Sequence, residues 1–214
     1  MALRIGIDFD NTIVCYDEVF VRIARAEGLI PGDLKGGKAE VRDFLRKLSG
    51  GEEKWQRLQG RVYGDQMDSA SLFEGAARFL TRCRERGDAR VFIVSHKTEF
   101  GHFDARGINL RDAARAWMMR HRFFDKDGFN LPGDALYFEP TRDDKIGRVA
   151  RLDCTHFIDD LEEVLEDSRF PAATRRILFL NARSARSGRS GRPTADYDVC
   201  ADWREIEEAV FANA

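Results

Sequence analysis

The sequence predicts an α/β fold in which a mostly parallel sheet carries helices on both faces. Short apolar runs, each as long as a buried strand, recur along the chain and end in polar or turn residues. Helical patterns lie between these runs, and strands that alternate with helices are typical of parallel sheets. With 214 residues, of which 43% are hydrophobic, the chain is long enough to bury a core of this kind.

The expected elements follow in chain order. Five apolar runs are the expected strands, at Leu3–Phe9, Ala89–Val94, Ala135–Phe138, His156–Ile158 and Arg176–Leu180. Helical spacing of apolar residues predicts the helices between and after them, at Gly75–Arg86, Ile108–Arg122, Lys145–Leu152, Leu161–Asp167 and Trp203–Ala212.

One interval interrupts this alternation. About eighty residues separate the first strand from Ala89, and a simple crossover needs far fewer. Three helical patterns fill the interval, at Tyr16–Gly28, Ala39–Leu48 and Glu52–Tyr63. We therefore expect a core domain made of residues 1–15 and 72–214 and a small helical insertion at 16–71, which would emerge beside the end of the first strand. An elongated structural crossover is the alternative.

Composition excludes several classes of protein. A formal net charge of −2 gives no electrostatic reason to expect a nucleic acid or membrane partner. No apolar run approaches the roughly 20 residues that span a bilayer, and no secretory signal is visible. The four cysteines are scattered without Cys-x-x-Cys spacing, which favours reduced thiols in a cytoplasmic protein. The Ser/Gly/Arg-rich run Arg183–Arg192 is expected to be a solvated loop.

Two carboxylates follow the first expected strand. Asp8 and Asp10 stand two residues apart in Asp8-Phe9-Asp10-Asn11-Thr12. Open α/β sheets place their chemistry at the carboxyl ends of strands, and residues i and i+2 of an extended chain point to the same side. One carboxylate could attack or bind a metal while the other moves a proton. A solvated turn is the alternative.

Three later signals occupy comparable positions. Ser95 ends the second strand, where a hydroxyl and backbone N–H groups can hold phosphate oxygens. Lys145 opens a helix and could face an anion, with Arg142 as a rival for that role. Asp159 and Asp160 follow another strand, and adjacent acids repel one another unless a cation is present. Oxygen ligands of this kind suit Mg²⁺, although capping of the next helix would also explain them.

The order of these motifs resembles the haloacid dehalogenase superfamily, and specifically its phosphatase branch, whose core is Rossmann-like. Asp8-Phe9-Asp10-Asn11-Thr12 is similar to the first motif, Ser95 to the second, Lys145 to the third and Asp159-Asp160 to the acidic fourth. Asn11 stands where many members have glycine. The position of the helical insertion is similar to that of the family's type-1 cap.

The resemblance implies a mechanism. Asp8 would be the nucleophile that forms an aspartyl-phosphate, and Asp10 would protonate the leaving oxygen and then activate water. Mg²⁺ would be held by Asp8, the backbone carbonyl of Asp10 and a carboxylate of the fourth motif. Asp160 is the preferred ligand, with Asp159 orienting Lys145 or a bound water, and the reverse assignment stays open.

The phosphoryl oxygens would be held by two side chains and by the backbone. Ser95 and Lys145 supply the side chains, and N–H groups near Phe9 and His96 supply the backbone contacts. A catalytic His96 is not required, because Asp10 already serves as the acid and base.

The predicted function is an Mg²⁺-dependent phosphomonoester hydrolase acting on a small phosphorylated metabolite, a sugar phosphate or a nucleotide. The alternative from another class is a non-catalytic or regulatory protein that retains the metal and phosphate site. Asp10 disfavours a dehalogenase, because halide leaves unprotonated. A phosphonate hydrolase would need a lysine from the cap, and Lys35, Lys38 and Lys54 lie there.

The insertion should also read the leaving group. The candidate residues are Trp55, Arg57, Gln59, Arg61 and Tyr63, and His96, Lys97 and His102 could line the entrance. The sequence does not predict an oligomeric state.

Overall fold

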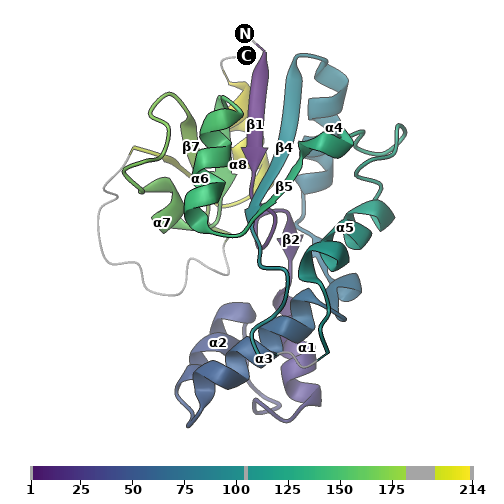
Figure 1. Ribbon diagram of the computed structural model, residues 1–214, viewed down its shortest axis with the longest axis vertical. Helices are drawn as coiled ribbons and strands as arrows, with labels where there is room; N and C mark the ends of the chain where they lie inside the picture. The colour runs from purple at the N-terminus through teal and green to yellow at the C-terminus, as the bar shows by residue number, and fades with distance from the viewer. Residues whose placement is uncertain (1, 104–105, 182–195, 213–214) are drawn as a thin grey trace. The chain divides into compact units, whose positions relative to one another are not determined.

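A six-stranded sheet forms the centre of the computed structural model, which describes residues 2–103, 106–181 and 196–212. The strand order is β5-β4-β1-β6-β7-β8, and neighbouring strands pair in parallel (Figure 1). The strands are β1 (Leu3–Ile7), β4 (Ala89–His96), β5 (Leu136–Glu139), β6 (His156–Asp159), β7 (Arg175–Phe179) and β8 (Asp198–Cys200). The predicted α/β architecture with a mostly parallel sheet is confirmed.

The strand order has a switch point at β1. After β1 the chain adds β4 and then β5 on one side, and later returns to add β6, β7 and β8 on the other. Crossover connections therefore leave the sheet in opposite directions beside β1, and the crevice at the carboxyl ends of such neighbouring strands is where open α/β sheets bind ligands. This topology places the carboxyl ends of β1, β4 and β6 side by side.

Helices cover both faces of the sheet. The helices α6 (Arg142–Arg151) and α7 (Glu162–Leu165) share one apolar cluster with β4 and β6 (Figure 1). On the opposite face, α4 (Ala76–Arg86) and α8 (Trp203–Phe211) pack together through Phe79, Trp203 and Phe211. Gly6 allows close packing on the α6 face, because a Cβ there would lie 2.6 Å from the Phe157 ring.

Several boundaries differ from those expected. β1 ends at Ile7 rather than Phe9, because the chain turns immediately after Asp8. β4 continues to His96, since Ser95 and His96 still pair with β5. α6 begins at Arg142, three residues before Lys145, because the Thr141 side chain caps it. The short strand β8 was not expected.

The chain divides into two compact units. The first contains Met1–Val14, Leu72–Lys97 and His121–Ala214, and the second contains Cys15–Ser71 and Thr98–Arg120. The chain passes between the units in β2 (Val14–Cys15) and β3 (Ser71–Leu72), which form a separate two-stranded sheet.

The second unit is helical. It contains α1 (Asp17–Ala26), α2 (Lys38–Arg46), α3 (Gly51–Tyr63), the 3-10 helix η1 (Met67–Ser69) and α5 (Leu110–Arg120). Phe20 stacks on Trp55 with ring centroids 5.0 Å apart and forms the aromatic centre of this unit. The buried Trp117 of α5 donates a hydrogen bond to the Ala70 carbonyl at 2.9 Å, which ties 98–120 to this unit. The sequence pattern instead predicts 98–120 as part of the core domain.

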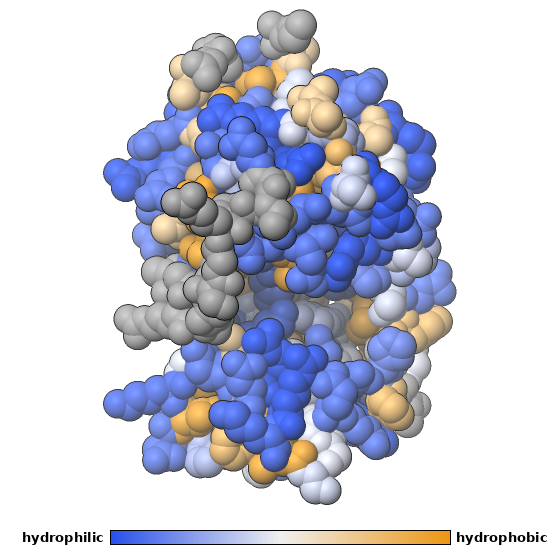
Figure 2. Space-filling view, turned by 90° about the vertical axis from the view of Figure 1, so that its left-hand side faces the viewer, coloured by the Kyte–Doolittle hydropathy of each residue, from blue (hydrophilic) through white to orange (hydrophobic). Residues whose placement is uncertain are grey.

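The described surface is mostly hydrophilic. Figure 2 shows one face of the molecule on which hydrophilic residues predominate and apolar residues are scattered. None of the helices in the described ranges is both long enough and apolar enough to cross a bilayer. The run Arg183–Arg192, expected to be a loop, lies outside the described residues.

Candidate active site

The loop after β1 carries the first two acids. The Asp8 N–H donates to the Ile158 carbonyl at 2.9 Å and extends the pairing between β1 and β6 by one residue. The chain then turns, and the Phe9 carbonyl accepts hydrogen bonds from Ile13 and Val14. Asn11 has φ +64°, in the left-handed region that glycine and asparagine tolerate best. This backbone explains why asparagine can replace glycine at that position.

Asp8 is buried and fully engaged. Its side chain is 6% exposed, and its Oδ1 accepts hydrogen bonds from the Ser95 hydroxyl at 2.9 Å and from the Lys145 ammonium at 2.6 Å. Ser95 reaches it because β4 lies next to β1 in the sheet. The predicted signals from the first, second and third motifs therefore meet at a single carboxylate.

Lys145 links this carboxylate to the fourth motif. Its ammonium lies 2.6 Å from Asp159 Oδ2 as well as from Asp8, and its side chain is 2% exposed. Burial lowers the pKa of Lys145, but Asp159 and Asp8 raise it by more, so the net shift is upward and the lysine stays charged. Arg142, the rival residue, is exposed and pairs instead with Glu163 at 2.7 Å.

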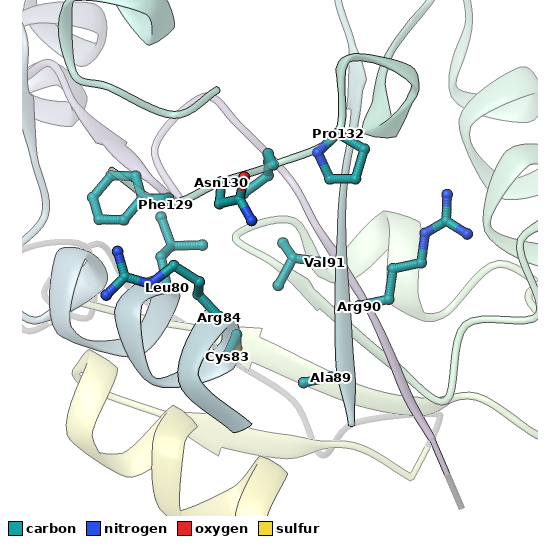
Figure 3. A pocket seen from close by; sticks show the side chains of 10 residues that line it. Leu80, Cys83, Arg84, Ala89, Arg90, Val91, Phe129, Asn130 and Pro132 are labelled. Atoms are coloured by element: carbon teal, nitrogen blue, oxygen red, sulfur yellow. The ribbon is translucent and has the colours of Figure 1, made fainter. Parts of the chain in front are cut away.

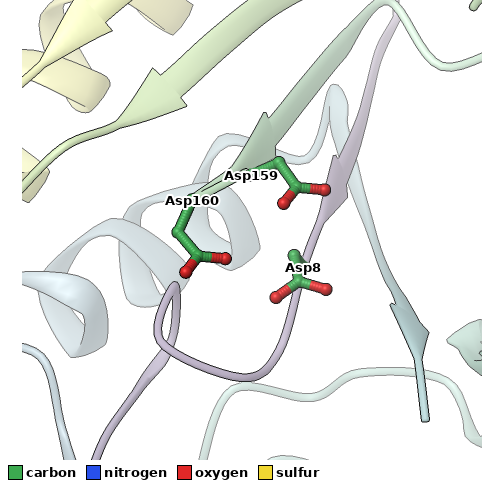
Figure 4. A group of neighbouring side chains, drawn as sticks. All are labelled: Asp8, Asp159 and Asp160. Carbon is green, nitrogen blue, oxygen red and sulfur yellow. The ribbon is translucent and has the colours of Figure 1, made fainter. Parts of the chain in front are cut away.

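Three carboxylates form a cluster at the ends of β1 and β6. Oxygen atoms of Asp8, Asp159 and Asp160 lie within 4.8 Å of one another, and Figure 4 shows how the three side chains gather. Burial raises the pKa of Asp159, although Lys145 opposes that shift. Asp159 also accepts a hydrogen bond from the Leu161 N–H at 3.1 Å. Its other oxygen, Oδ2, contacts the Lys145 ammonium as an ion pair but accepts no hydrogen bond from the described residues.

The cluster fits a divalent cation. Three carboxylates beside one ammonium leave two negative charges, and acids this close repel each other by several kcal/mol at an effective dielectric of about 20. Among the described residues, the cluster contains three carboxylates and no histidine or cysteine. Hard oxygen ligands of this kind suit Mg²⁺ or Ca²⁺ rather than softer metals.

Asp10 has a different partner. The Lys97 ammonium donates to Asp10 Oδ1 at 2.9 Å and to Oδ2 at 2.7 Å. From the sequence, Lys97 is expected at the entrance of the site, and its contact with Asp10 is not predicted. The available signal was its position, one residue beyond β4 and two residues after Ser95.

Phe9 and His96 lie beside these groups. Phe9 is fully buried, with its ring edge-on to Phe138 at 5.9 Å and 5.6 Å from the Lys97 ammonium. His96 is the exposed last residue of β4. Partial burial of the His96 ring lowers its pKa, and the charge of Lys145 lowers it further.

Solved structures with this architecture were found by comparison. One is a D,D-heptose 1,7-bisphosphate phosphatase from B. bronchiseptica complexed with magnesium and phosphate, with 14% identity, 99% of each chain covered and a TM-score of 0.57. Another is a haloacid dehalogenase family hydrolase from Deinococcus radiodurans R1 with bound phosphate and sodium, with 15% identity, coverage of 97% of this chain and 94% of that one, and a TM-score of 0.54. The chain has the haloacid dehalogenase-like fold.

The same fold also carries another named activity. Protein Tyrosine Kinase A of Mycobacterium tuberculosis matches at 16% identity and a TM-score of 0.64, with 98% of each chain covered. Neither a protein-family model nor a curated protein matches the sequence. The expected haloacid dehalogenase-like fold is confirmed, and the activity has to be argued from the site itself.

The residues expected to recognise a leaving group occupy different environments in the second unit. Trp55 is buried in the unit's centre, and the two arginines are paired, Arg57 with Glu53 and Arg61 with Glu27. Gln59 and Tyr63 instead line a cavity of about 120 Å³ within this unit. The other residues that line it are Gln56, Gly60, Thr98, Gly101, His102 and Leu110.

A second cavity lies in the first unit, at the amino end of β4. It measures about 190 Å³ and is bordered by Cys83, Ala89 and the segment Phe129–Pro132 (Figure 3). The guanidinium groups of Arg84 and Arg90 point apart on its two sides, and Arg84 donates to the Gly128 carbonyl. No predicted site residue of the haloacid dehalogenase-like core borders this cavity.

Proposed function

We propose that this protein is an Mg²⁺-dependent phosphomonoester hydrolase that acts on a small phosphorylated metabolite. One observation carries the proposal: the buried Asp8 carboxylate lies between the Ser95 hydroxyl and the Lys145 ammonium, beside two further acids. A nucleophile, two donors for phosphoryl oxygens and a cation site are together the parts that phosphoryl transfer requires. A solved phosphatase structure of the same fold supports this assignment.

Asp8 acts as the nucleophile. Its carboxylate oxygen attacks phosphorus, a new oxygen–phosphorus bond forms, and the bond between phosphorus and the leaving oxygen breaks. Ser95 and Lys145 both donate hydrogen bonds to Asp8 Oδ1, so their donor groups adjoin the carboxylate that would attack phosphorus. Their donors stabilise charge on the phosphoryl oxygens in the transition state. Backbone N–H groups near Phe9 and His96 add to this cradle.

Asp10 moves the protons. In the first step it gives a proton to the leaving oxygen, and in the second it takes a proton from the water that attacks phosphorus. That attack breaks the bond between Asp8 and phosphorus and releases inorganic phosphate. Asp10 lies on the same loop as Asp8 but points its carboxylate to Lys97 and outside the acidic cluster. The two acids therefore have different surroundings, as different roles require.

Mg²⁺ would be held by Asp8, Asp160 and the backbone carbonyl of Asp10. Bound there, it screens the repulsion between an anionic nucleophile and an anionic phosphate. Asp160 is favoured over Asp159 as the ligand because Asp160 is only partly buried, whereas Asp159 is fully buried and ion-paired with Lys145. Asp159 then orients Lys145, whose ammonium spans it and Asp8.

The second unit acts as the cap, and its cavity reads the leaving group. The cavity is lined by amide, phenol, hydroxyl and imidazole groups from Gln56, Gln59, Tyr63, Thr98 and His102. Such groups donate and accept hydrogen bonds and suit a polyhydroxylated group. The cavity is connected to the proposed catalytic groups through the sequence, because the cavity residue Thr98 directly follows Lys97, which binds Asp10. A sugar phosphate is therefore the preferred substrate class.

Phosphate release from a panel of phosphorylated metabolites, with and without Mg²⁺, tests the reaction. The wild type should turn over with Mg²⁺, and Asp8→Asn should lose at least about 10³-fold. A wild type whose Mg²⁺-dependent turnover equals that of Asp8→Asn is a binding protein that retains the fold, which is the alternative function.

Two cavity variants test the substrate class. Gln59→Leu and Tyr63→Phe should raise KM for the best sugar phosphate about tenfold or less and leave turnover of an aryl phosphate unchanged, since one lost hydrogen bond is worth about 0.5–1.5 kcal/mol. Gln66→Leu is the matched control, because Gln66 contacts Arg22 and does not line the cavity. An equal loss with both substrates would exclude a role of the cavity in recognition.

A further inference from the structure

Lys97 is a buried lysine of the first unit that forms an ion pair with Asp10. Its side chain is 3% exposed, whereas that of Asp10 is 18% exposed. The Lys97 N–H donates to the Glu139 carbonyl at 3.0 Å, which extends the pairing of β4 with β5 by one residue. The lysine backbone is therefore fixed by the sheet, and its side chain lies against the Phe9 ring.

The position of Lys97 constrains Asp10. A buried ammonium is stable only when an anion or several acceptors compensate its charge. Here the two hydrogen bonds to both Asp10 oxygens fix the plane of that carboxylate. The loop around Asp10 leaves its side chain partly exposed, so the lysine supplies an orientation that packing alone does not provide.

We infer that Lys97 is a positioning residue that aims the Asp10 carboxyl group during both proton transfers. The inference rests on the proposed phosphatase function. In each step one Asp10 oxygen keeps its hydrogen bond to the ammonium, and the other oxygen carries the proton. Lys97 retains its own protons throughout, so the proton balance of the reaction is the one between Asp10, the leaving oxygen and water.

The geometry separates Lys97 from Lys145. Lys145 contacts Asp8 and Asp159, so its removal acts on the nucleophile and the acidic cluster. Lys97 contacts Asp10, so its removal acts on proton transfer. An alkoxide leaving group needs a proton far more than a nitrophenolate does. The rate reduction caused by removing Lys97 should therefore depend on the leaving group. Removal of a merely structural ion pair would not produce such a dependence.

A double-mutant cycle with two substrates tests this inference. The variants are Lys97→Met, Asp10→Asn and their combination, assayed with an alkyl phosphate and with p-nitrophenyl phosphate. Lys97→Met should lower kcat/KM, which reports the first step, about 10²-fold with the alkyl phosphate and about tenfold or less with the aryl phosphate, since general acid catalysis contributes 10²–10⁴-fold. In the Asp10→Asn background the same change should cost less than about twofold, because residues that act as a unit are not additive.

Three controls complete the design. Lys97→Arg keeps the charge and should recover part of the lost kcat/KM, and Lys126→Met removes an exposed lysine of the same unit and should change nothing. Thermal melting identifies folded variants, and Lys97→Gln replaces Lys97→Met in the cycle if the latter unfolds.

The outcomes distinguish this inference from the proposed function. A wild type without Mg²⁺-dependent turnover refutes the phosphatase and the role of Lys97 with it. An active wild type in which Lys97→Met lowers kcat/KM by the same factor with both substrates, or by the same factor with and without Asp10→Asn, refutes the role of Lys97 alone.

Discussion

The two ends of β4 have opposite character. At the amino end, a cavity of about 190 Å³ is lined by apolar side chains, a thiol and arginines that point apart. At the carboxyl end, Ser95 and Lys97 are buried and contact the two acids of the β1 loop. The larger of the two described cavities therefore lies at the amino end of β4, away from the buried charged groups at its carboxyl end. Buried charged groups with specific partners mark the site of chemistry better than volume does.

The largest effect is expected from removing Lys145, the ammonium group at the centre of the carboxyl-end site. Lys145→Met leaves three neighbouring carboxylates without their ammonium, so the metal-free protein should lose about 3–5 kcal/mol of unfolding free energy. Turnover should fall about 10²–10³-fold because a transition-state donor is lost. Urea unfolding and phosphate release measure the two effects.

Arg90→Met is the matched change at the amino end. Arg90 is exposed, with a long ion pair to Asp134 at 3.7 Å, so its loss should stay within about 0.5 kcal/mol and leave turnover intact. Equal destabilisation by the two variants would contradict the contrast between the two ends.

Mg²⁺ should stabilise the fold through the acidic cluster. At a concentration of about 100 times its Kd, the ion should add about 2.7 kcal/mol to the unfolding free energy of the wild type. Asp160→Asn removes a proposed ligand and should abolish most of this gain, whereas Asp134→Asn at the amino end should retain it. Thermal melting with and without Mg²⁺ makes the measurement, and an unchanged gain in Asp160→Asn would count against the cluster as the metal site.

The thiol at the amino end should be inert. Burial raises the pKa of Cys83 to about 12, and the nearby Glu207 carboxylate contributes to that shift. Because the thiolate is the reactive form, alkylation of native Cys83 at pH 8 should be many times slower than in urea. Mass mapping of the modified peptide gives both rates. Equal rates would show that this end is open and reactive.

The smallest effect concerns His156 at the amino end of β6. Burial lowers its pKa, and Arg175 lowers it further. The folded state then binds the proton less readily than the unfolded chain, so its contribution to stability is present above the ordinary histidine pKa of about 6.5 and is lost as the pH falls below it. Melting of the wild type and His156→Gln between pH 7 and 5 should show a steeper loss in the wild type; parallel curves would argue against this account.

The sequence predicts the carboxyl end better than the rest of the molecule. Ser95 and Asp159 each end a recognisable apolar run, and parallel pairing brings such ends together. Residue contacts across the loop are harder to foresee. Lys97 meets Asp10 only because β4 pairs with β5 for two residues more than the apolar run Ala89–Val94 indicates.

The helical unit shows a second limit of sequence reasoning. The apolar spacing predicts the helix α5, but its membership of the second unit depends on contacts distant in sequence, such as those of Trp117 with Ala70 and of Arg120 with Asp68. The strand β8 has three residues, of which only Cys200 is buried, so it carries too short a pattern to recognise. Whether 16–71 serves as a cap stays a prediction.

The central claim is that Asp8 carries the phosphoryl group while Asp10 moves the protons. Asp10→Asn should slow the attack of water on the intermediate, so the variant mixed with an aryl phosphate and Mg²⁺, then quenched in acid, should accumulate a phosphoryl group on the peptide that contains Asp8. Asp8→Asn should show none. A phosphoryl group found on another residue, or its absence from Asp10→Asn during active turnover, would contradict the account.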